Sequence, residues 1–294
     1  MARQHINPNA YIDDQGRALV GSLTLEVGTA DLKASIRRTV DLIGGFGRAI
    51  KPGQRVLIKP NFNSPDPVPA RGDPDFIVAV IDLLREEGVD DITVAESSGG
   101  PWLPTRNVLE KTGFAERMRR HGVPVVILEE GDFVTVEVPG ARHLKKARIA
   151  RPTFDYDRLI YLPNLKTHKW ARFTMSIKLS MGLTHPADRE GMHQEGLEEK
   201  VAELGLVVRP DLIVLDGRKA FVTQGPSHGE LVEPNVIMAS GDQVAMDVEA
   251  VKVLQSYKAE NRIGGDPWEL PQIKVAAAAE GRVRGPGDCA VRMG

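Results

Sequence analysis

The chain contains almost no cysteine. Cys289 is its one cysteine among 294 residues, so the chain cannot form an intramolecular disulfide and has no CxxC pair for zinc or an iron–sulfur cluster. It also lacks any run of about 18 apolar residues that could span a membrane, and its first residues lack the apolar core of a signal peptide. We therefore expect a soluble, cytoplasmic protein that does not interact with membranes.

A strong net charge and the common nucleotide-binding motifs are absent too. The formal net charge is −2, which gives no long-range field to attract nucleic acid. No GxGxxG follows a predicted strand, and GxxxxGK[ST] does not occur. Rossmann dehydrogenases and P-loop enzymes are therefore disfavoured. A local basic patch at 142–172 remains the weakest of the alternatives, so we expect no nucleic-acid partner.

Apolar runs alternate with helical patterns along most of the chain, which is typical of parallel βαβ construction. Predicted strands lie at 20–27, 54–62, 91–95, 124–128, 158–163, 211–216 and 236–239, with antiparallel or edge strands near 133–138 and 147–150. Asp73 and Asp242 are predicted helix N-caps. We expect an α/β fold with a mostly parallel sheet, flanking helices and some antiparallel edge strands in the middle of the chain.

The domain organisation has two readings. The chain forms one domain over 1–294, or two lobes of about 20–130 and 150–255. In both readings, 256–294 is a carboxyl-terminal helix followed by a loose tail.

Polar residues follow four predicted strands, at 58–65, 95–100, 161–169 and 215–221. Ligands of open α/β sheets bind at the carboxyl ends of strands, where helix N-termini and free amides converge. Two of these ends share the pair Pro-Asn, which could simply turn the chain. Because a lysine stands close to each pair, we expect a binding site here, with these residues contacting substrate: Lys59, Asn61, Ser97 and Asn164.

Residues 158–187 contain no Asp or Glu, although about four would be expected from the composition. The segment holds five basic residues, Arg158, Lys166, Lys169, Arg172 and Lys178, together with His168 and His185. Such a cluster attracts a carboxylate, phosphate or sulfonate, and the alternative is a solvated basic face. Apolar residues interleave with the cations, which favours a site for a small anion.

Within this stretch, residues 173–181 (FTMSIKLSM) alternate strictly between apolar and polar side chains. A period of two predicts a strand whose polar face carries Lys178. A helix would instead place Thr174 and Lys178 one turn apart. Lys178 is available to a ligand in either conformation.

His168 is the predicted general acid–base residue. Lys166 stands two residues before it on the same strand exit, so both could reach one substrate, and the cation would lower the pKa of the imidazole. Asp216 ends a buried strand and offers a catalytic carboxylate. Asp247 lies one turn inside a helix without a capping role, and we expect it to contact substrate or orient a site lysine or histidine.

A divalent metal is an alternative use for the histidines. His168, His185 and His193 could gather around one ion with a carboxylate, since neutral imidazole is the commonest metal ligand. Their spacing matches neither HExxH nor a related motif. The metal site therefore remains the less favoured alternative, and the cofactor is unknown.

The order of the motifs resembles the domain-of-unknown-function 362 family over about residues 20–255. The resemblance rests on KPNFNSP, AESSGG, LPNLKTHKW, SIKLSMGL and GDQVAMD. Many members of that family carry an iron–sulfur module, and this chain departs from them because Cys289 is its one cysteine. The family's organisation is distantly similar to that of nickel-pincer lactate racemases, which raises the expectation of a carboxylate substrate and assigns no residue.

We therefore expect an enzyme that acts on a small anionic metabolite by lysine- and histidine-assisted proton transfer, such as an isomerase or epimerase. Lys59, Lys166 and Lys178 would hold the anion while His168 exchanges the proton. The alternative is a metal- or cofactor-binding protein without turnover, or a partner of a separate redox protein. The oligomeric state is not predicted.

Overall fold

The computed structural model describes residues 4–26, 31–100, 103–278 and 283–294, and its framework is one mixed sheet. The main strand order is β13-β1-β12-β10-β7-β2-β3-β4, with β8, β9 and β11 attached beside β10. The strands are β1 (Ala18–Thr24), β2 (Val56–Lys59), β3 (Ile92–Glu96), β4 (Val125–Ile127), β7 (Arg158–Tyr161), β8 (Asn164–His168), β9 (Arg172–Phe173), β10 (Leu212–Phe221), β11 (Leu231–Val232), β12 (Val236–Ser240) and β13 (Cys289–Met293). Pairing is parallel from β10 through β7, β2 and β3 to β4. The predicted α/β class with a mostly parallel sheet is confirmed.

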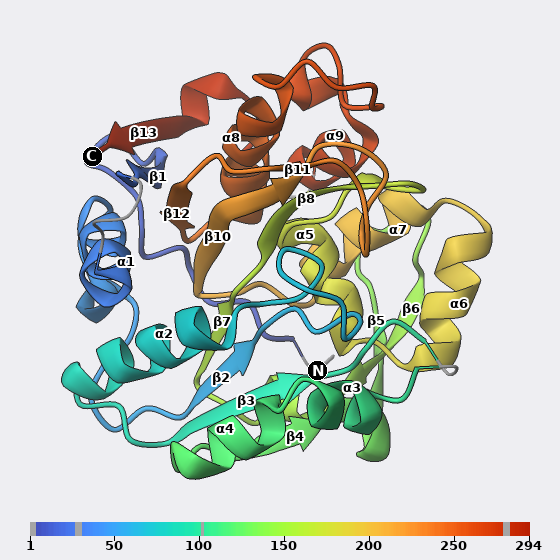
Figure 1. Ribbon diagram of the computed structural model, residues 1–294. Coiled ribbons are helices and arrows are strands. Elements are labelled where there is room, and N and C mark those ends of the chain that lie inside the picture. The colour runs from blue at the N-terminus through green and yellow to red at the C-terminus, as the bar shows by residue number, and fades with distance from the viewer. Residues whose placement is uncertain (1–3, 27–30, 101–102, 279–282) are drawn as a thin grey trace.

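Helices cover both faces of this sheet (Figure 1). One face packs against α1 (Leu32–Asp41), α2 (Pro74–Glu86), α3 (Thr105–Lys111) and α4 (Phe114–Arg120). The other packs against α5 (Ser176–Leu179), α6 (Pro186–Gln194), α7 (Leu197–Glu203), α8 (Gln243–Gln255) and α9 (Pro271–Ala277). Leu57 faces the second layer, whereas Val56 and Ile58 face the first. The central strands are continuously apolar because both of their faces are buried.

The predicted caps are confirmed. The Asp73 carboxylate accepts a hydrogen bond from the backbone N–H of Asp75, and Pro74 is the first residue of α2. Asp242 accepts from the N–H groups of Val244 and Ala245 at the start of α8. These caps satisfy amides that would lack partners at a helix N-terminus.

The predicted strand over 173–181 is wrong. Ser176–Leu179 is α5, and a 3₁₀ turn follows at Ser180–Leu183. Ser176 and Ser180 are as deeply buried as Ile177, so the alternation in sequence does not separate a buried face from an exposed one. The Asp247 carboxylate, 70 residues away, accepts from the backbone N–H of Ile177 and fixes the first turn of the helix.

The prediction of a loose carboxyl-terminal tail is also wrong. Residues Cys289–Met293 form β13, which pairs in parallel with β1 at one edge of the sheet (Figure 1). Val291 and Met293 stay exposed on this strand, which explains why the segment carries no burial pattern. Backbone pairing with β1 orders the strand, together with the packing of Cys289 and Ala290 against the core.

The antiparallel strands predicted in the middle of the chain are confirmed as β5 (Phe133–Glu137) and β6 (Lys146–Ala150). They form a separate two-stranded sheet and are not edge strands of the main one. Antiparallel pairs also occur in the main sheet, where β12 lies between β1 and β10. No described helix combines the length and apolar character needed to cross a membrane.

Candidate functional site

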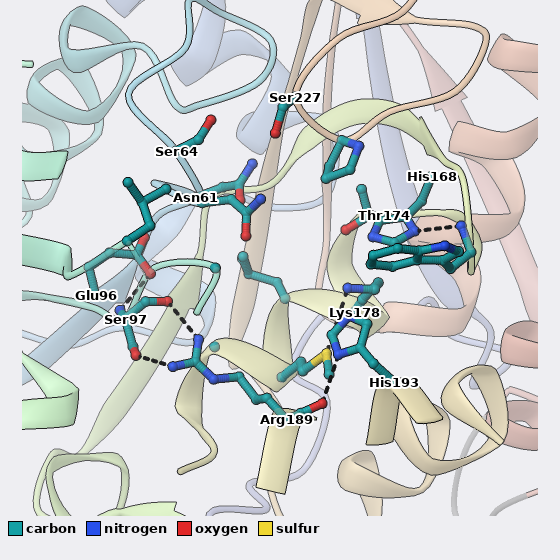
Figure 2. Close-up of a pocket in the computed structure, with 18 of the residues that line it drawn as sticks. Asn61, Ser64, Glu96, Ser97, His168, Thr174, Lys178, Arg189, His193 and Ser227 are labelled. Atoms are coloured by element: carbon teal, nitrogen blue, oxygen red, sulfur yellow. Dashed lines mark hydrogen bonds between the residues drawn. The ribbon is translucent and has the colours of Figure 1, made fainter. Parts of the chain in front are cut away.

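A cavity of about 270 Å³ lies where β2, β3 and β8 end. Residues after β2, at the end of β3 and at the end of β8 line it, together with α5, α6 and the loop at 226–227. In Figure 2, His168, Thr174, Lys178 and His193 lie on one side of the cavity, and Glu96 and Ser97 lie on the other. The carboxyl ends of parallel strands thus bring together side chains far apart in sequence.

Lys59 and Glu96 form a buried ion pair in the wall of the cavity. The Lys59 ammonium also donates to the carbonyl of Pro60 at 2.7 Å, and Glu96 accepts from the backbone N–H groups of Phe62 and Ser97. Burial lowers the pKa of Lys59, and Glu96 opposes that shift. Because Glu96 neutralises it, Lys59 contributes little net charge to the cavity.

Arg189 of α6 places its guanidinium group in the same wall of the cavity. The residue is buried, with 7 % of its surface exposed. It donates to the carbonyls of Ser97 and Ser98 and to the Ser97 hydroxyl. Its Nε is buried without a hydrogen-bond partner. Burial lowers the pKa of Arg189, which still carries its charge at neutral pH. The hydrogen-bond partners of the guanidinium are neutral oxygens, although the charges of Glu129 and Glu96 also act on it. It can therefore still attract an anion.

Lys178 of α5 is the second cation of the cavity. Its ammonium lies 3.6 Å from the sulfur of Met181, and no carboxylate bonds it within the described part of the chain. Burial, and then the charge of Arg189, lower the pKa of Lys178 to about 8. Lys178 is therefore an amine that can gain or lose a proton near neutral pH.

His168 is 5 % exposed and accepts two hydrogen bonds at one nitrogen. Its Nδ1 lies 3.1 Å from the backbone N–H groups of both Trp170 and Ala171. Burial, followed by the charge of Lys178, holds the pKa of His168 far below its usual range. The neutral ring must then carry its proton on Nε2, so His168 presents an N–H donor.

His193 has the opposite tautomer. Its Nδ1 lies 2.7 Å from the carbonyl oxygen of Arg189, to which it donates. Nε2 is therefore the nitrogen with a free lone pair. Burial lowers the pKa of His193, and the Arg189 carbonyl opposes the shift. A neutral His193 that lines the cavity can accept a proton there.

Trp170 and Lys169 form the rim. The Trp170 indole is 59 % exposed, and the Lys169 ammonium lies 4.3 Å from its ring centroid. The His193 ring meets Trp170 edge-on at 5.6 Å between centroids. An exposed indole of this kind places an aromatic surface and a cation at the entrance of the cavity.

Several predicted site residues lie away from the cavity lining. Lys166 is 1 % exposed and donates to the carbonyl of Ala70 at 2.7 Å, and burial lowers its pKa to about 7. The Asn164 side chain accepts from Asn61, which does line the cavity. Asp216 pairs with Arg218 at 2.8 Å. His185 caps α6 by accepting from Ala187.

Asp247 does not touch a lysine or histidine of the cavity, contrary to the expected orienting role. It accepts from the N–H and hydroxyl of Ser176 and from the N–H of Ile177, and burial raises its pKa to about 6. It therefore caps α5 from α8. Asp247 holds in place the short helix that carries Lys178.

Replacing Asp247 with asparagine should destabilise the protein by about 2 kcal/mol, because one carboxylate oxygen becomes an amide that faces a backbone N–H. Urea unfolding followed by circular dichroism measures the change. Asp266→Asn is the matched control, since Asp266 caps a surface turn by accepting from Trp268. Equal losses in the two variants would contradict the special role of Asp247.

Residues that sequence reasoning missed complete the site. Glu96, Arg189 and Trp170 line the cavity but were not chosen as site residues. Glu96 lies within the polar strand end at 95–100, so its position in the sequence could have identified it as a site residue. Arg189 follows the acid-free segment by two positions and carried no signal of its own. Within the described residues, no group of three or more His, Cys, Asp or Glu side chains is placed to hold a metal ion.

Comparison with known proteins finds similarity to a cyanobacterial protein and to a solved structure. The chain is 30 % identical over 291 residues to the thylakoid-associated protein sll1697 of Synechocystis sp., with 87 % of this chain and 88 % of that protein covered. It is also similar to the lactate racemase apoprotein of Thermoanaerobacterium thermosaccharolyticum, with a TM-score of 0.45 and 12 % identity. That match covers 86 % of this chain and 62 % of the racemase chain.

A family model described as domain of unknown function (DUF362) matches residues 56–252. The matched segment holds β2, β3, β8, α5 and α6, which carry the cavity. The resemblance seen in the motifs is thus confirmed, and the chain belongs to the DUF362 family.

Proposed function

We propose that the protein is an enzyme that binds a small anionic metabolite in this cavity and moves a proton on it. The observation that carries the proposal is Lys178, a cavity-lining ammonium with no carboxylate partner in the described part of the chain. Arg189 adds a second charge that neutral oxygens hold. Two cations in one small cavity, neither hydrogen-bonded to a carboxylate of the described residues, favour an anion as ligand.

The two histidines differ in the role they can take. His168 presents Nε2–H, because its Nδ1 already accepts two backbone hydrogen bonds. We therefore move the acid–base role first given to His168 to His193, whose Nε2 lone pair is free. His168 would donate a hydrogen bond to an oxygen of the substrate, where negative charge develops.

Proton transfer needs a base, a donor and a cation around one substrate, and the cavity has all three. His193 or neutral Lys178 would remove a proton, His168 would hydrogen-bond the oxygen that gains charge, and Arg189 would hold the anionic group. Isomerisation and epimerisation are the simplest reactions of this kind. Lys166 would act through the charge it places behind the wall, whereas Lys59, neutralised by Glu96, would not hold the anion.

Binding of small carboxylates and phosphate, measured by isothermal titration calorimetry, tests this proposal. Lys178→Met should weaken anion binding at least tenfold at pH 7, because a hydrogen bond to a charged group contributes about 1.5–3 kcal/mol. In the unmodified protein, affinity should be high below pH 8 and fall as the pH rises through about 8, where Lys178 loses its proton.

Lys252→Met is the control, since Lys252 lies on the surface of α8 and pairs with Glu249. This variant should bind anions as the unmodified protein does. If Lys178→Met binds every anion as tightly as Lys252→Met, the cavity is not the anion site.

The cellular location also stays a proposal: the composition favours the cytoplasm, whereas the cyanobacterial relative is named for its association with thylakoids.

A further inference from the structure

Lys178 has the surroundings of a nucleophilic amine as well as those of an anion-binding cation. Its hydrogen-bond contact, the Met181 thioether at 3.6 Å, is a weak acceptor that does little to retain the proton. The neighbouring charge is Arg189, which further favours the neutral amine. An amine with a lowered pKa inside a cavity is the group that attacks carbonyl carbons in Schiff-base chemistry.

We propose that Lys178 forms a covalent imine with a short-chain 2-oxo carboxylate bound in the cavity. The inference rests on the proposed function and adds the substrate class to it. The carboxylate would lie against Arg189 and Lys169, and the carbonyl oxygen would accept from the Nε2–H of His168. All four residues line the same cavity, whose volume of about 270 Å³ suits a small molecule. His168, Lys178 and Arg189 are labelled in Figure 2.

The steps balance without an added reagent. The neutral Lys178 amine adds to the carbonyl carbon, and the carbonyl oxygen becomes a hydroxyl by taking up one proton from solvent. His193 accepts the proton that the nitrogen loses and returns a proton to the hydroxyl, which leaves as water. The product is a protonated imine between Nζ and the former carbonyl carbon, with no oxidation or reduction.

Other lysines near the cavity are less suited to this chemistry. Lys59 is held as an ion pair by Glu96. The Lys166 amine donates to Ala70, and the residue is not part of the cavity lining. Lys169 lies at the rim against Trp170, where its ammonium is stabilised by the indole ring. Of these four lysines, Lys178 is the one that lines the cavity with neither a carboxylate nor an aromatic ring against its amine, as far as the described residues show.

Reductive trapping tests the inference. The purified protein is incubated with pyruvate or glyoxylate and sodium cyanoborohydride, then digested and analysed by mass spectrometry. We expect one modified peptide, carrying the acid less one oxygen atom on Lys178. Lys178→Arg keeps the charge but removes the nucleophile, so trapping should fall at least tenfold. Lys252→Met, which alters a surface lysine of α8, should still be trapped at Lys178. Propionaldehyde, which lacks the carboxylate, should react at least tenfold less.

Oxalate separates a failure of this inference from a failure of the proposed function. It presents two carboxylates but no ketone or aldehyde, so it can bind without forming an imine. Oxalate binding that Lys178→Met weakens, with no trapping of either oxo acid, would overturn the imine and leave the anion site standing. Trapping at Lys166 or Lys169, or equal trapping of the Lys178→Arg variant, would also overturn it. Absence of both binding and trapping would remove both proposals.

Discussion

Glu96→Gln lowers the free energy of unfolding by about 3–5 kcal/mol, since removing one partner of a buried ion pair leaves the other charge without compensation. Lys59 and Glu96 have side chains exposed by 2 % and 1 %, and Glu96 also accepts from the N–H groups of Phe62 and Ser97. A glutamine places an amide N–H against one of these donors. Urea unfolding followed by circular dichroism measures the loss.

Glu130→Gln is the control. Glu130 pairs with Arg106 on the surface, where both side chains are about half exposed, and an exposed pair contributes about 0–1 kcal/mol. Combining Glu96→Gln with Lys59→Met should recover part of the stability, because the uncompensated ammonium is gone. A double variant no more stable than Glu96→Gln would show that the loss comes from the backbone hydrogen bonds and not from the charge of Lys59.

The pairing of Lys59 with Glu96 could not be predicted from the sequence. The polar ends of the β2 and β3 strands predict that their side chains meet, because parallel strands end at one edge of a sheet. The sequence does not show that Lys59 is neutralised there, since its partner Glu96 lies 37 residues away. Lys59 was therefore expected to hold an anion, whereas the structure places it in an ion pair with Glu96.

Lys166 and His168 illustrate a second limit. Residues two apart on a strand point to the same side, which predicts that Lys166 and His168 face one cavity. The Lys166 amine donates a hydrogen bond to the carbonyl of Ala70. Of the two residues, His168 lines the cavity and Lys166 does not. Neither loop placement nor histidine tautomer can be read from residue order. The tautomer nevertheless decides which of His168 and His193 can accept a proton.

The fold was more predictable than the site for a physical reason. Strands buried on both faces and helices with one apolar stripe leave periodic patterns, and most predicted elements follow them. The α5 segment broke this rule because its serines are buried like its apolar residues and its start is set by Asp247 from another helix. The Cys289–Met293 strand broke it because an edge strand is held by backbone hydrogen bonds, which leave no pattern of side chains.

Gly225→Ala should destabilise the protein by about 3 kcal/mol and weaken anion binding as well. Gly225 has φ of +66°, where an L side chain is strained, and an added Cβ would lie 1.9 Å from the carbonyl oxygen of Thr167. The atom that the new Cβ meets belongs to the backbone of β8 and cannot rotate away. The loop that contains Gly225 must therefore move away from the strand. The hydrogen bond from the Lys169 N–H to the Gly225 carbonyl would then lengthen.

Because Thr167 directly precedes His168, this movement reaches the cavity, and so does the displacement of the neighbouring Ser227. Gly191→Ala is the matched control: Gly191 lies in α6 between Arg189 and His193, and an added Cβ meets nothing within 4 Å. It should raise stability by about 0.5–1 kcal/mol, because alanine favours helix more than glycine does. Urea unfolding and calorimetric anion titration of both variants measure the two effects. A Gly225→Ala protein as stable as Gly191→Ala would mean that the loop and the strand are not in contact as the structure places them, and that His168 is positioned by other contacts.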